Sequence, residues 1–264
     1  MTSLRSDTSW IAPESPDVVW FAGSDAKRFL NDLISQEIGD MADGEARRSL
    51  LLAPQGKLLF ILWVVKDGDR YGVVTEPGRG EELATTLGRY RIRVDVDIEV
   101  ESDDVWLVMA DGDGFDVSWS GVSRRLLIGE RPDLAMGTSD EYDRLRVAAG
   151  EPAWGVDVDE GTIPHESGLV PTSVDFTKGC FLGQELVARI DSRGGNTPRN
   201  LRLLRASLPI RAGDAITDGD GEEVGVVTSA SGEVGLAMLK RVVSPGDTVR
   251  VGEADAIVED VPSR

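Results

Sequence analysis

The sequence predicts an α+β fold that ends in a small all-β unit. Three observations predict it. Residues 24–38 carry an amphipathic pattern whose apolar side chains fall on one stripe of a helix. Several short strand patterns follow before residue 130, interrupted by one further helical pattern. Beyond residue 198 only short strands separated by turn residues remain, which is typical of a small barrel or sandwich. Strands, helix and strands in this order favour an antiparallel sheet over a doubly wound one.

The first helix is expected over residues 24–38, with Ser24 as its N-cap. In the segment 91–100, apolar residues alternate strictly with charged ones, which predicts a strand with one wet face. The remaining patterns predict strands at 48–53, 57–65, 71–75, 105–109 and 125–128, and helices at 80–90, 140–149 and 183–190. The Gly- and Pro-rich stretch 191–198 is typical of a domain boundary.

Composition excludes several classes of protein. The longest apolar run, residues 58–65, is too short to cross a bilayer, and the first ten residues lack the apolar stretch of a secretory signal. The chain holds one cysteine and one histidine, so it can form neither an internal disulfide nor a structural zinc site, and we expect no metal site. These features predict a cytoplasmic protein. A net charge of −19 disfavours direct binding to nucleic acid or an anionic membrane.

One stretch departs from this acidity. Residues 178–205 contain six basic and two acidic side chains, a balance of +4 in a chain of −19. The stretch is either an ordinary solvated face or a local patch that attracts anions, because spacing alone does not show whether the side chains converge.

The same stretch begins with KGCFLGQE, residues 178–185, which contains the single cysteine. Gly179 permits close approach of the backbone just before Cys180. If a helix begins near Leu182 or Gly183, its N-terminus and the neighbouring Lys178 would stabilise a thiolate. The motif permits a nucleophilic or redox-active thiol, or a single ligand of a shared metal or cluster. A small buried cysteine at a tight turn is the structural alternative.

Five blocks of sequence resemble the YgfZ-type folate-binding proteins, relatives of the glycine-cleavage T-protein that support iron–sulfur enzymes and some tRNA modifications. KGCFLGQE resembles the KGC[FY]xGQE signature of that family. The other blocks are FAGSDAKRFLNDLISQEI, LLAPQGKLLF, YDRLRVAAGEPAWGVDV and TIPHESGL, in the family's order. The resemblance covers nearly the whole chain.

The resemblance implies a T-protein-like ring of three domains around a folate pocket, with two interleaved α+β domains and a C-terminal β-barrel. The expected boundaries are residues 1–50 with 140–198, residues 51–139, and residues 199–264. Tetrahydrofolate or another folate is the implied ligand. Iron–sulfur assembly or client proteins are the implied partners, and the resemblance leaves open whether the chain catalyses a reaction.

The resemblance also implies site residues. Cys180 would be the working thiol, with Lys178 beside it. Tyr142 lies where relatives carry an aromatic that lines the pterin pocket. The other residues of the matched motifs, expected to hold the folate, are Arg146, Glu166, Gly179, Gly183, Gln184, Glu185 and Arg189.

One departure bears on the chemistry. The T-protein branch carries an aspartate that acts on the folate nitrogens, whereas the equivalent positions here are Phe60 and Ile61. An apolar side chain cannot replace a carboxylate in acid–base work. This favours a folate-binding accessory protein over the alternative, a folate-dependent aminomethyl or one-carbon transferase. That alternative would need a carboxylate from elsewhere, for which Glu166 is the candidate.

Overall fold

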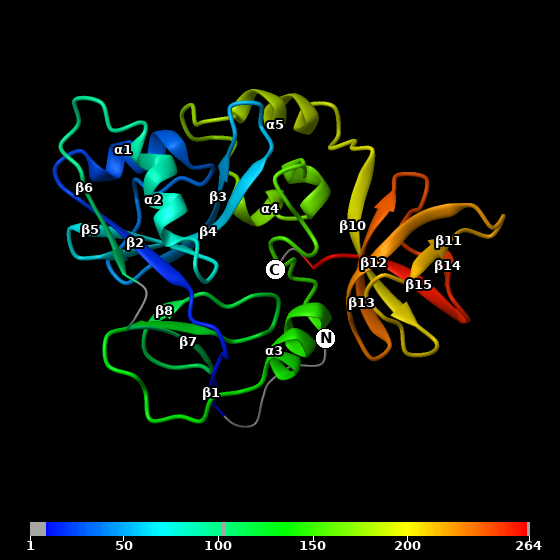
Figure 1. Cartoon of the computed structure of the whole chain (residues 1–264). Helices are drawn as coiled ribbons and strands as arrows, with labels where there is room; N and C mark the ends of the chain where they lie inside the picture. The colour runs from blue at the N-terminus through cyan, green and yellow to red at the C-terminus, as the bar shows by residue number, and fades with distance from the viewer. Residues whose placement is uncertain (1–8, 102–103, 263–264) are drawn as a thin grey trace.

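The computed structural model, which describes residues 9–101 and 104–262, has three parts (Figure 1). Two α+β parts lie to the left in Figure 1 and the barrel lies to the right. The first eight residues, on which the expected lack of a secretory signal largely rests, lie outside the described residues. The predicted fold class, a T-protein-like α+β ring with a C-terminal barrel, is confirmed.

The first α+β part is built on a five-stranded antiparallel sheet in the order β3-β4-β5-β2-β6. These strands are β2 (Asp17–Ala22), β3 (Ala46–Leu52), β4 (Leu58–Asp67), β5 (Arg70–Thr75) and β6 (Asp97–Glu101). Helices α1 (Ala26–Leu33) and α2 (Gly80–Gly88) bury their apolar stripes against one face. The opposite face of β3 and β4 turns toward the rest of the molecule, where it forms a second core with residues after 105.

The second sheet has four strands in the order β1-β7-β9-β8. They are β1 (Trp10–Ile11), β7 (Val105–Met109), β8 (Phe115–Asp116) and β9 (Arg125–Ile128). The first described strand, β1, therefore joins a sheet whose other members come about a hundred residues later, while β2 enters the first sheet. This exchange interleaves the two α+β parts. The domain boundaries expected from the sequence stay a prediction.

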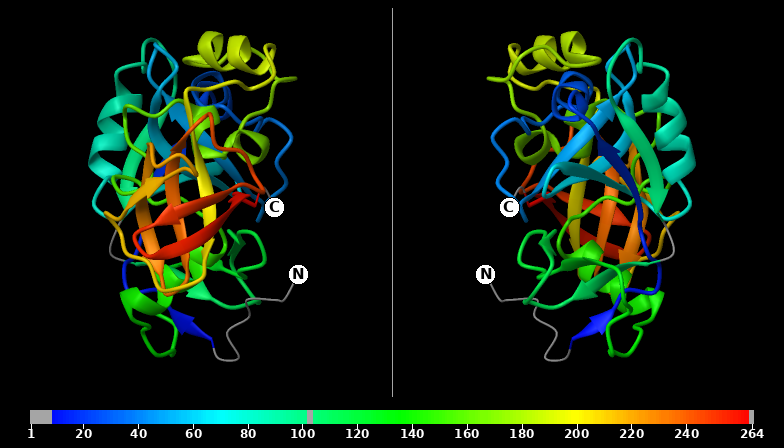
Figure 2. Two further views of the ribbon diagram at one scale, coloured as in Figure 1. Left: turned by 90° about the vertical axis from the view of Figure 1, so that its right-hand side faces the viewer. Right: turned by 90° about the vertical axis from the view of Figure 1, so that its left-hand side faces the viewer.

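The segment between the second sheet and the barrel carries short helices joined by long loops. It contains α3 (Ser139–Ala148), a 3₁₀ turn η1 (Pro164–Ser167), α4 (Val170–Ser173) and α5 (Gln184–Asp191). Of these, α4 contacts β3, and α3 lines the cavity described below. A full capping box at Thr138 and Glu141 starts α3. In the side views, α5 lies at the top of the molecule (Figure 2).

The C-terminal part is a closed six-stranded barrel in the order β10-β13-β12-β11-β14-β15. Its strands are β10 (Arg199–Ala206), β11 (Ala215–Thr217), β12 (Glu223–Ser231), β13 (Val234–Lys240), β14 (Thr248–Val251) and β15 (Ala254–Asp260). Closure leaves no open sheet edge, and inward-facing Val, Leu, Ile and Ala side chains fill the interior.

Two expected elements differ from the structure. Helix α1 ends at Leu33 rather than at residue 38, because Ile34 pairs with Leu51 and the amide of Ser35 donates to the carbonyl of Leu50. Ser24 is also not the N-cap, since its hydroxyl donates to Asp95. The alternating segment 91–100 is a strand only from Asp97 on: Arg93 has a φ of 56°, which breaks an extended run.

Candidate functional site

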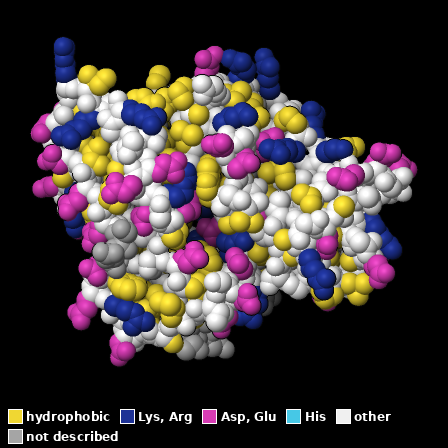
Figure 3. Space-filling view, in the orientation of Figure 1, with side chains coloured by type: hydrophobic (Ala, Val, Ile, Leu, Met, Phe, Trp, Pro, Cys, Tyr) yellow, Lys and Arg dark blue, Asp and Glu magenta, His cyan; other side chains and the backbone are white. Residues whose placement is uncertain are grey.

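A cavity of about 490 Å³ lies where the two sheets, α3 and the segment 151–156 meet. Figure 3 shows a hollow near the centre of the face in view, with acidic and basic side chains at its edge. Pockets of this size hold drug-sized ligands. The charged and aromatic side chains that line it are Glu14, Arg48, Trp63, Glu76, Arg79, Arg124, Tyr142, Asp143, Arg146, Glu151 and Trp154.

Two arginines share one carboxylate in the wall of this cavity. The two terminal nitrogens of Arg124 contact the two carboxylate oxygens of Glu151, at 2.9 Å and 2.8 Å. Arg48 donates to the same carboxylate at 3.1 Å. All three side chains are buried. Burial alone would raise the pKa of Glu151, but the attraction of Arg124 and Arg48 outweighs it and lowers that pKa. Burial and the neighbouring Arg124 lower the pKa of Arg48, but a guanidinium keeps its proton at neutral pH, so the cluster carries one more positive than negative charge.

The two arginines of this cluster, Arg48 and Arg124, form a positive pole in the cavity wall, and not all of their N–H donors are bonded. The Nε atoms of Arg48 and Arg124 are buried, and within the described ranges neither has a hydrogen-bond partner. The guanidinium of Arg48 stacks on Trp119, 4.0 Å from the ring centroid. A net positive, incompletely bonded cluster in a cavity wall favours a ligand that brings an anionic or strongly accepting group.

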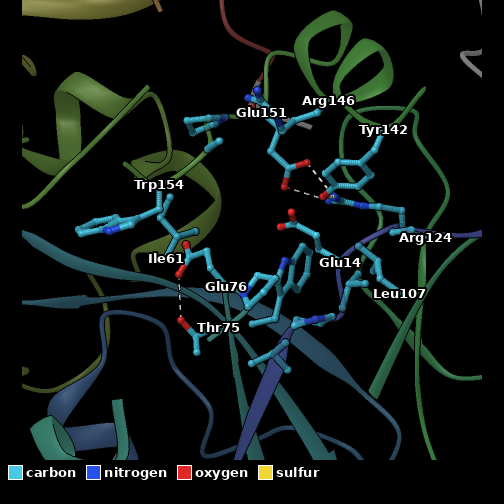
Figure 4. A pocket seen from close by; sticks show the side chains of 18 of the residues that line it. Glu14, Ile61, Thr75, Glu76, Leu107, Arg124, Tyr142, Arg146, Glu151 and Trp154 are labelled. Atoms are coloured by element: carbon cyan, nitrogen blue, oxygen red, sulfur yellow. Dashed lines mark hydrogen bonds and ion pairs between the residues drawn. The ribbon is translucent and has the colours of Figure 1, made fainter. Parts of the chain in front are cut away.

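Tyr142 lies beside this cluster, as Figure 4 shows, and lines the cavity. Its hydroxyl accepts a hydrogen bond from Arg124 at 3.3 Å. Burial raises the pKa of Tyr142, so the phenol is neutral and keeps its own O–H as a donor. The structure thus places this sequence-predicted residue in the cavity wall.

Arg146 also borders the cavity, but its donors are already engaged. They bind Asp143, Asp157, the carbonyl of Glu151 and Ser229 of β12. Arg146 therefore has little donor capacity left for a ligand, and its contact with folate stays a prediction. Its bonds tie α3 and the segment 151–157 to the barrel, so it positions the cavity wall.

The cysteine motif lies elsewhere. Cys180 is exposed and is not among the residues that line the cavity. Helix α5 begins at Gln184 with Gly183 as its N-cap, close to the expected start, and the thiol does not border this cavity; the role of Cys180 as the working thiol stays a prediction. The alternative of a buried structural cysteine is excluded, because the thiol faces solvent.

Lys178 binds the end of helix α1. Its Nζ donates to the carbonyl oxygens of Asn31, Ile34 and Gln36 at 2.8–2.9 Å, where α1 ends. Burial lowers the pKa of Lys178 to about 8, while the carbonyl oxygens favour the ammonium form, so the group is protonated at neutral pH. Lys178 caps the end of α1 and anchors the cysteine loop, and the expected effect of its charge on the thiol stays a prediction.

Gly183 holds the other end of this loop. It adopts a φ of 76°, and a Cβ there would lie 2.5 Å from the carbonyl oxygen of Ala53 and 3.2 Å from the Cα of Gly56. Only glycine fits so close to the β3–β4 turn. Gly183 thus fixes the loop and contacts no cavity.

The remaining predicted folate contacts also lie outside the cavity lining. Glu166 is buried, accepts from the amide of Ile163 and lies 3.4 Å from Arg199. Glu185 and Arg189 pair with each other on α5 at 2.7 Å. Gly179 directly precedes Cys180, and Gln184 is the first residue of α5. Of the residues predicted to contact folate, only Tyr142 and Arg146 line the cavity.

The basic stretch does not form a free anion-binding patch. Arg202 and Arg205 lie on β10 and pair with Asp260 and Glu259 of β15. Together with the pairs of Arg189 and Arg199, these contacts neutralise most of the stretch side chain by side chain. The reading as an ordinary solvated face is the one that the structure supports.

Phe60 and Ile61, the positions equivalent to the aspartate of the T-protein branch, place their side chains on opposite faces of β4. Ile61 lines the cavity, whereas Phe60 is buried in the core under α1 and α2. The alternation of side chains along a strand requires this separation.

The sequence did not indicate five of the charged and aromatic residues that line the cavity: Arg48, Arg124, Glu151, Glu76 and Trp154. For Arg48 and Arg124 the signal is that paired arginines precede the apolar residues of the strand-like stretches ARRSLLL and SRRLLI.

Comparison with known proteins agrees with this architecture. Residues 199–260 match the family model of the CAF17 C-terminal beta-barrel domain. The crystal structure of the glycine cleavage system aminomethyltransferase T from Bartonella henselae superposes with a TM-score of 0.82 at 18% identity. The match covers 98% of this chain and 86% of that one.

Curated relatives align over shorter stretches. A chloroplastic protein of Arabidopsis thaliana is 37% identical over 137 residues, 49% of this chain and 31% of the relative. The mitochondrial iron-sulfur cluster assembly factor IBA57 of Mus musculus is 35% identical over 116 residues, 41% of this chain and 32% of the relative. Its homologue in Cryptococcus neoformans is 36% identical over 108 residues, 38% of this chain and 29% of the relative. The matches thus span about a third of the length of these relatives.

The ring of two interleaved α+β parts and a closed barrel defines a protein of the T-protein fold. The barrel of the chain matches the CAF17 C-terminal domain model, and stretches of the chain are similar to IBA57 assembly factors, which agrees with the resemblance inferred from the sequence. In the described part of the chain, no helix is both long and apolar enough to cross a membrane.

Proposed function

We propose that the chain is a tetrahydrofolate-binding accessory protein that supports iron–sulfur cluster assembly or repair, and through it cluster-dependent tRNA modification. The cavity carries the folate part of the proposal. Tyr142 and Trp154 offer flat surfaces for a pterin ring, and the Arg48–Arg124–Glu151 cluster offers a positive pole for a carboxylate of the glutamate tail. A volume of about 490 Å³ suits a ligand of this class.

The iron–sulfur part of the proposal is supported by the relatives named IBA57. Cys180 supports it from the structure, because Lys178 and Gly183 fix a loop whose thiol faces solvent. One thiolate supplies a single ligand of a cluster, so the other ligands would come from an assembly or client protein. The folate cavity and the thiol are then two separate sites. A cytoplasmic location remains part of the proposal, although the named relatives are mitochondrial or chloroplastic.

Complementation tests both sites. In a strain that lacks the native gene, we expect wild-type protein to restore the activity of a cluster-dependent enzyme and Cys180→Ser to fail at equal protein level. Arg124→Met should lower the rescue, because it removes the excess positive charge at the cavity wall. Full rescue by Cys180→Ser would contradict the role of the thiol.

The second candidate is a folate-dependent one-carbon or aminomethyl transferase. It is favoured by a relative, the aminomethyltransferase of Staphylococcus carnosus, which is 32% identical over 120 residues. Ile61 in the cavity wall disfavours it, since the carboxylate of the T-protein branch is absent from that position. Turnover of methylenetetrahydrofolate by purified protein with an amine donor would establish this candidate over the first.

A further inference from the structure

The cavity contains a carboxyl group on the same wall as Ile61. Strands β4 and β5 are antiparallel, with Trp63 opposite Val74 and Val64 opposite Val73. Continuing this register by two residues places Glu76 opposite Ile61, on the same face of the sheet. Both residues line the cavity, and Figure 4 shows them side by side. The carboxyl absent from β4 therefore has a counterpart one strand away.

The carboxyl of Glu76 is only partly bonded. The hydroxyl of Thr75 donates to Oε2 at 2.9 Å, and Arg79 lies 3.5 Å from the same oxygen. The backbone amide of Glu76 also bonds its own carboxyl, and among residues 9–101 and 104–262 the side chains of Thr75 and Arg79, both bound to Oε2, are the only others that donate to it. In Figure 4 the carboxyl lies between Thr75 and Trp154, with one oxygen turned away from the Thr75 hydroxyl.

Arg79 is committed to other partners. It is held by Glu82 at 3.0 Å and donates to the carbonyl of Leu59, while its guanidinium lies between the rings of Phe60 and Trp154. Its pairing with Glu76 is the longest of its polar contacts, at 3.5 Å, and Arg79 cannot move closer to Glu76 without breaking the others. Burial raises the pKa of Glu76 by more than its own amide, Thr75 and the nearby arginines lower it.

A pterin ring offers the donors that are missing. Its pyrimidine edge carries a ring N–H and an exocyclic amino group side by side, and one carboxylate can accept hydrogen bonds from both. We propose that Glu76 binds the amino-pyrimidine edge of the folate and so fixes which end of the ligand enters this part of the cavity. The proposal rests on folate binding and adds the residue that determines ligand orientation. The positive pole at Arg48 and Arg124 then takes the opposite, anionic end.

Two ligands that differ at this edge test the assignment. Folic acid and its 2-desamino-2-methyl analogue share the rest of the molecule, and both are stable in air. Their dissociation constants are measured from quenching of the chain's own tryptophan fluorescence. We expect wild-type protein to prefer folic acid by roughly tenfold or more, since a hydrogen bond to a charged group is lost with the analogue. In Glu76→Gln the preference should fall to near one.

Glu82→Gln is the matched control, because it removes the other carboxylate beside Arg79 and lies outside the cavity lining. It should keep the wild-type preference. Thr75→Val, which removes the hydroxyl that holds Oε2, provides a second variant and should reduce the preference. If both Glu76→Gln and Thr75→Val discriminate as well as wild type, the assignment is overturned while folate binding stands. If wild type binds neither ligand, folate binding itself fails.

Discussion

Arg124 and Glu151 face each other across the wall of the central cavity with two parallel contacts, at 2.9 Å and 2.8 Å. The pair joins the second sheet to the segment after α3. Because Arg48 from the first sheet binds the same carboxylate, Glu151 links both α+β parts at the point where the cavity forms. The ion pair is thus part of the architecture as well as of the candidate ligand site.

Glu151→Gln should destabilise the fold strongly. The substitution leaves two buried guanidinium groups without their counter-ion, which costs about 3–5 kcal/mol. Urea unfolding followed by tryptophan fluorescence measures the change. Glu82→Gln, which breaks an exposed pair, should cost less than about 1 kcal/mol. A loss for Glu151→Gln as small as that of the control would refute the buried cluster.

Lys178→Ala should destabilise the protein by about 2–3 kcal/mol, because it leaves the carbonyl groups at the end of α1 without a donor. Lys27→Ala is the control, since that side chain makes one long contact of 3.5 Å at the surface. Chemical denaturation compares the two. Equal stabilities would show that Lys178 does not anchor the cysteine loop.

Gly183→Ala should cost about 2–4 kcal/mol, combining a left-handed backbone with a collision against Ala53 and Leu52. Gly68 has a φ of 57° but open space around it, so Gly68→Ala should cost only about 1 kcal/mol. The difference between the two melting curves isolates the packing of the loop on the β3–β4 turn. No difference would mean that this close packing is absent.

Stability should decline as the pH falls below 6.5. Burial lowers the pKa of His165 below its usual 6.5, although Asp191 lies 3.9 Å away and acts in the opposite direction. The unfolded chain therefore takes up this proton at a higher pH than the native form, so the contribution is full above 6.5 and is lost on acidification. Urea midpoints at pH 7.5 and 5.5 should differ less in His165→Leu than in wild type. An unchanged difference would assign the acid sensitivity to carboxylates alone.

The sequence predicted the fold class and the barrel well, because short strands with turn residues and matched motif blocks are local signals. It also indicated Tyr142 as a cavity residue. For Cys180 the resemblance implied a working thiol with Lys178 beside it. The lysine satisfies the end of α1, a contact between residues more than 140 positions apart that no local pattern reveals.

The charged cluster of the cavity could not be predicted from the sequence either, because it also depends on contacts between residues far apart in the chain. Arg48, Arg124 and Glu151 come from three separate segments, and each alone resembles a surface charge. The premature end of α1 was missed because Ile34 and Ile38 stay in the same core whether the chain is helical or extended there.

Calorimetric titration with tetrahydrofolate tests the central claim most directly. The account predicts saturable binding of one ligand per chain in wild type, weakened roughly tenfold or more in Arg124→Met, since a hydrogen bond to a charged group is lost. Absence of any heat of binding in correctly folded wild-type protein, at ligand concentrations on the order of 1 mM, would contradict it.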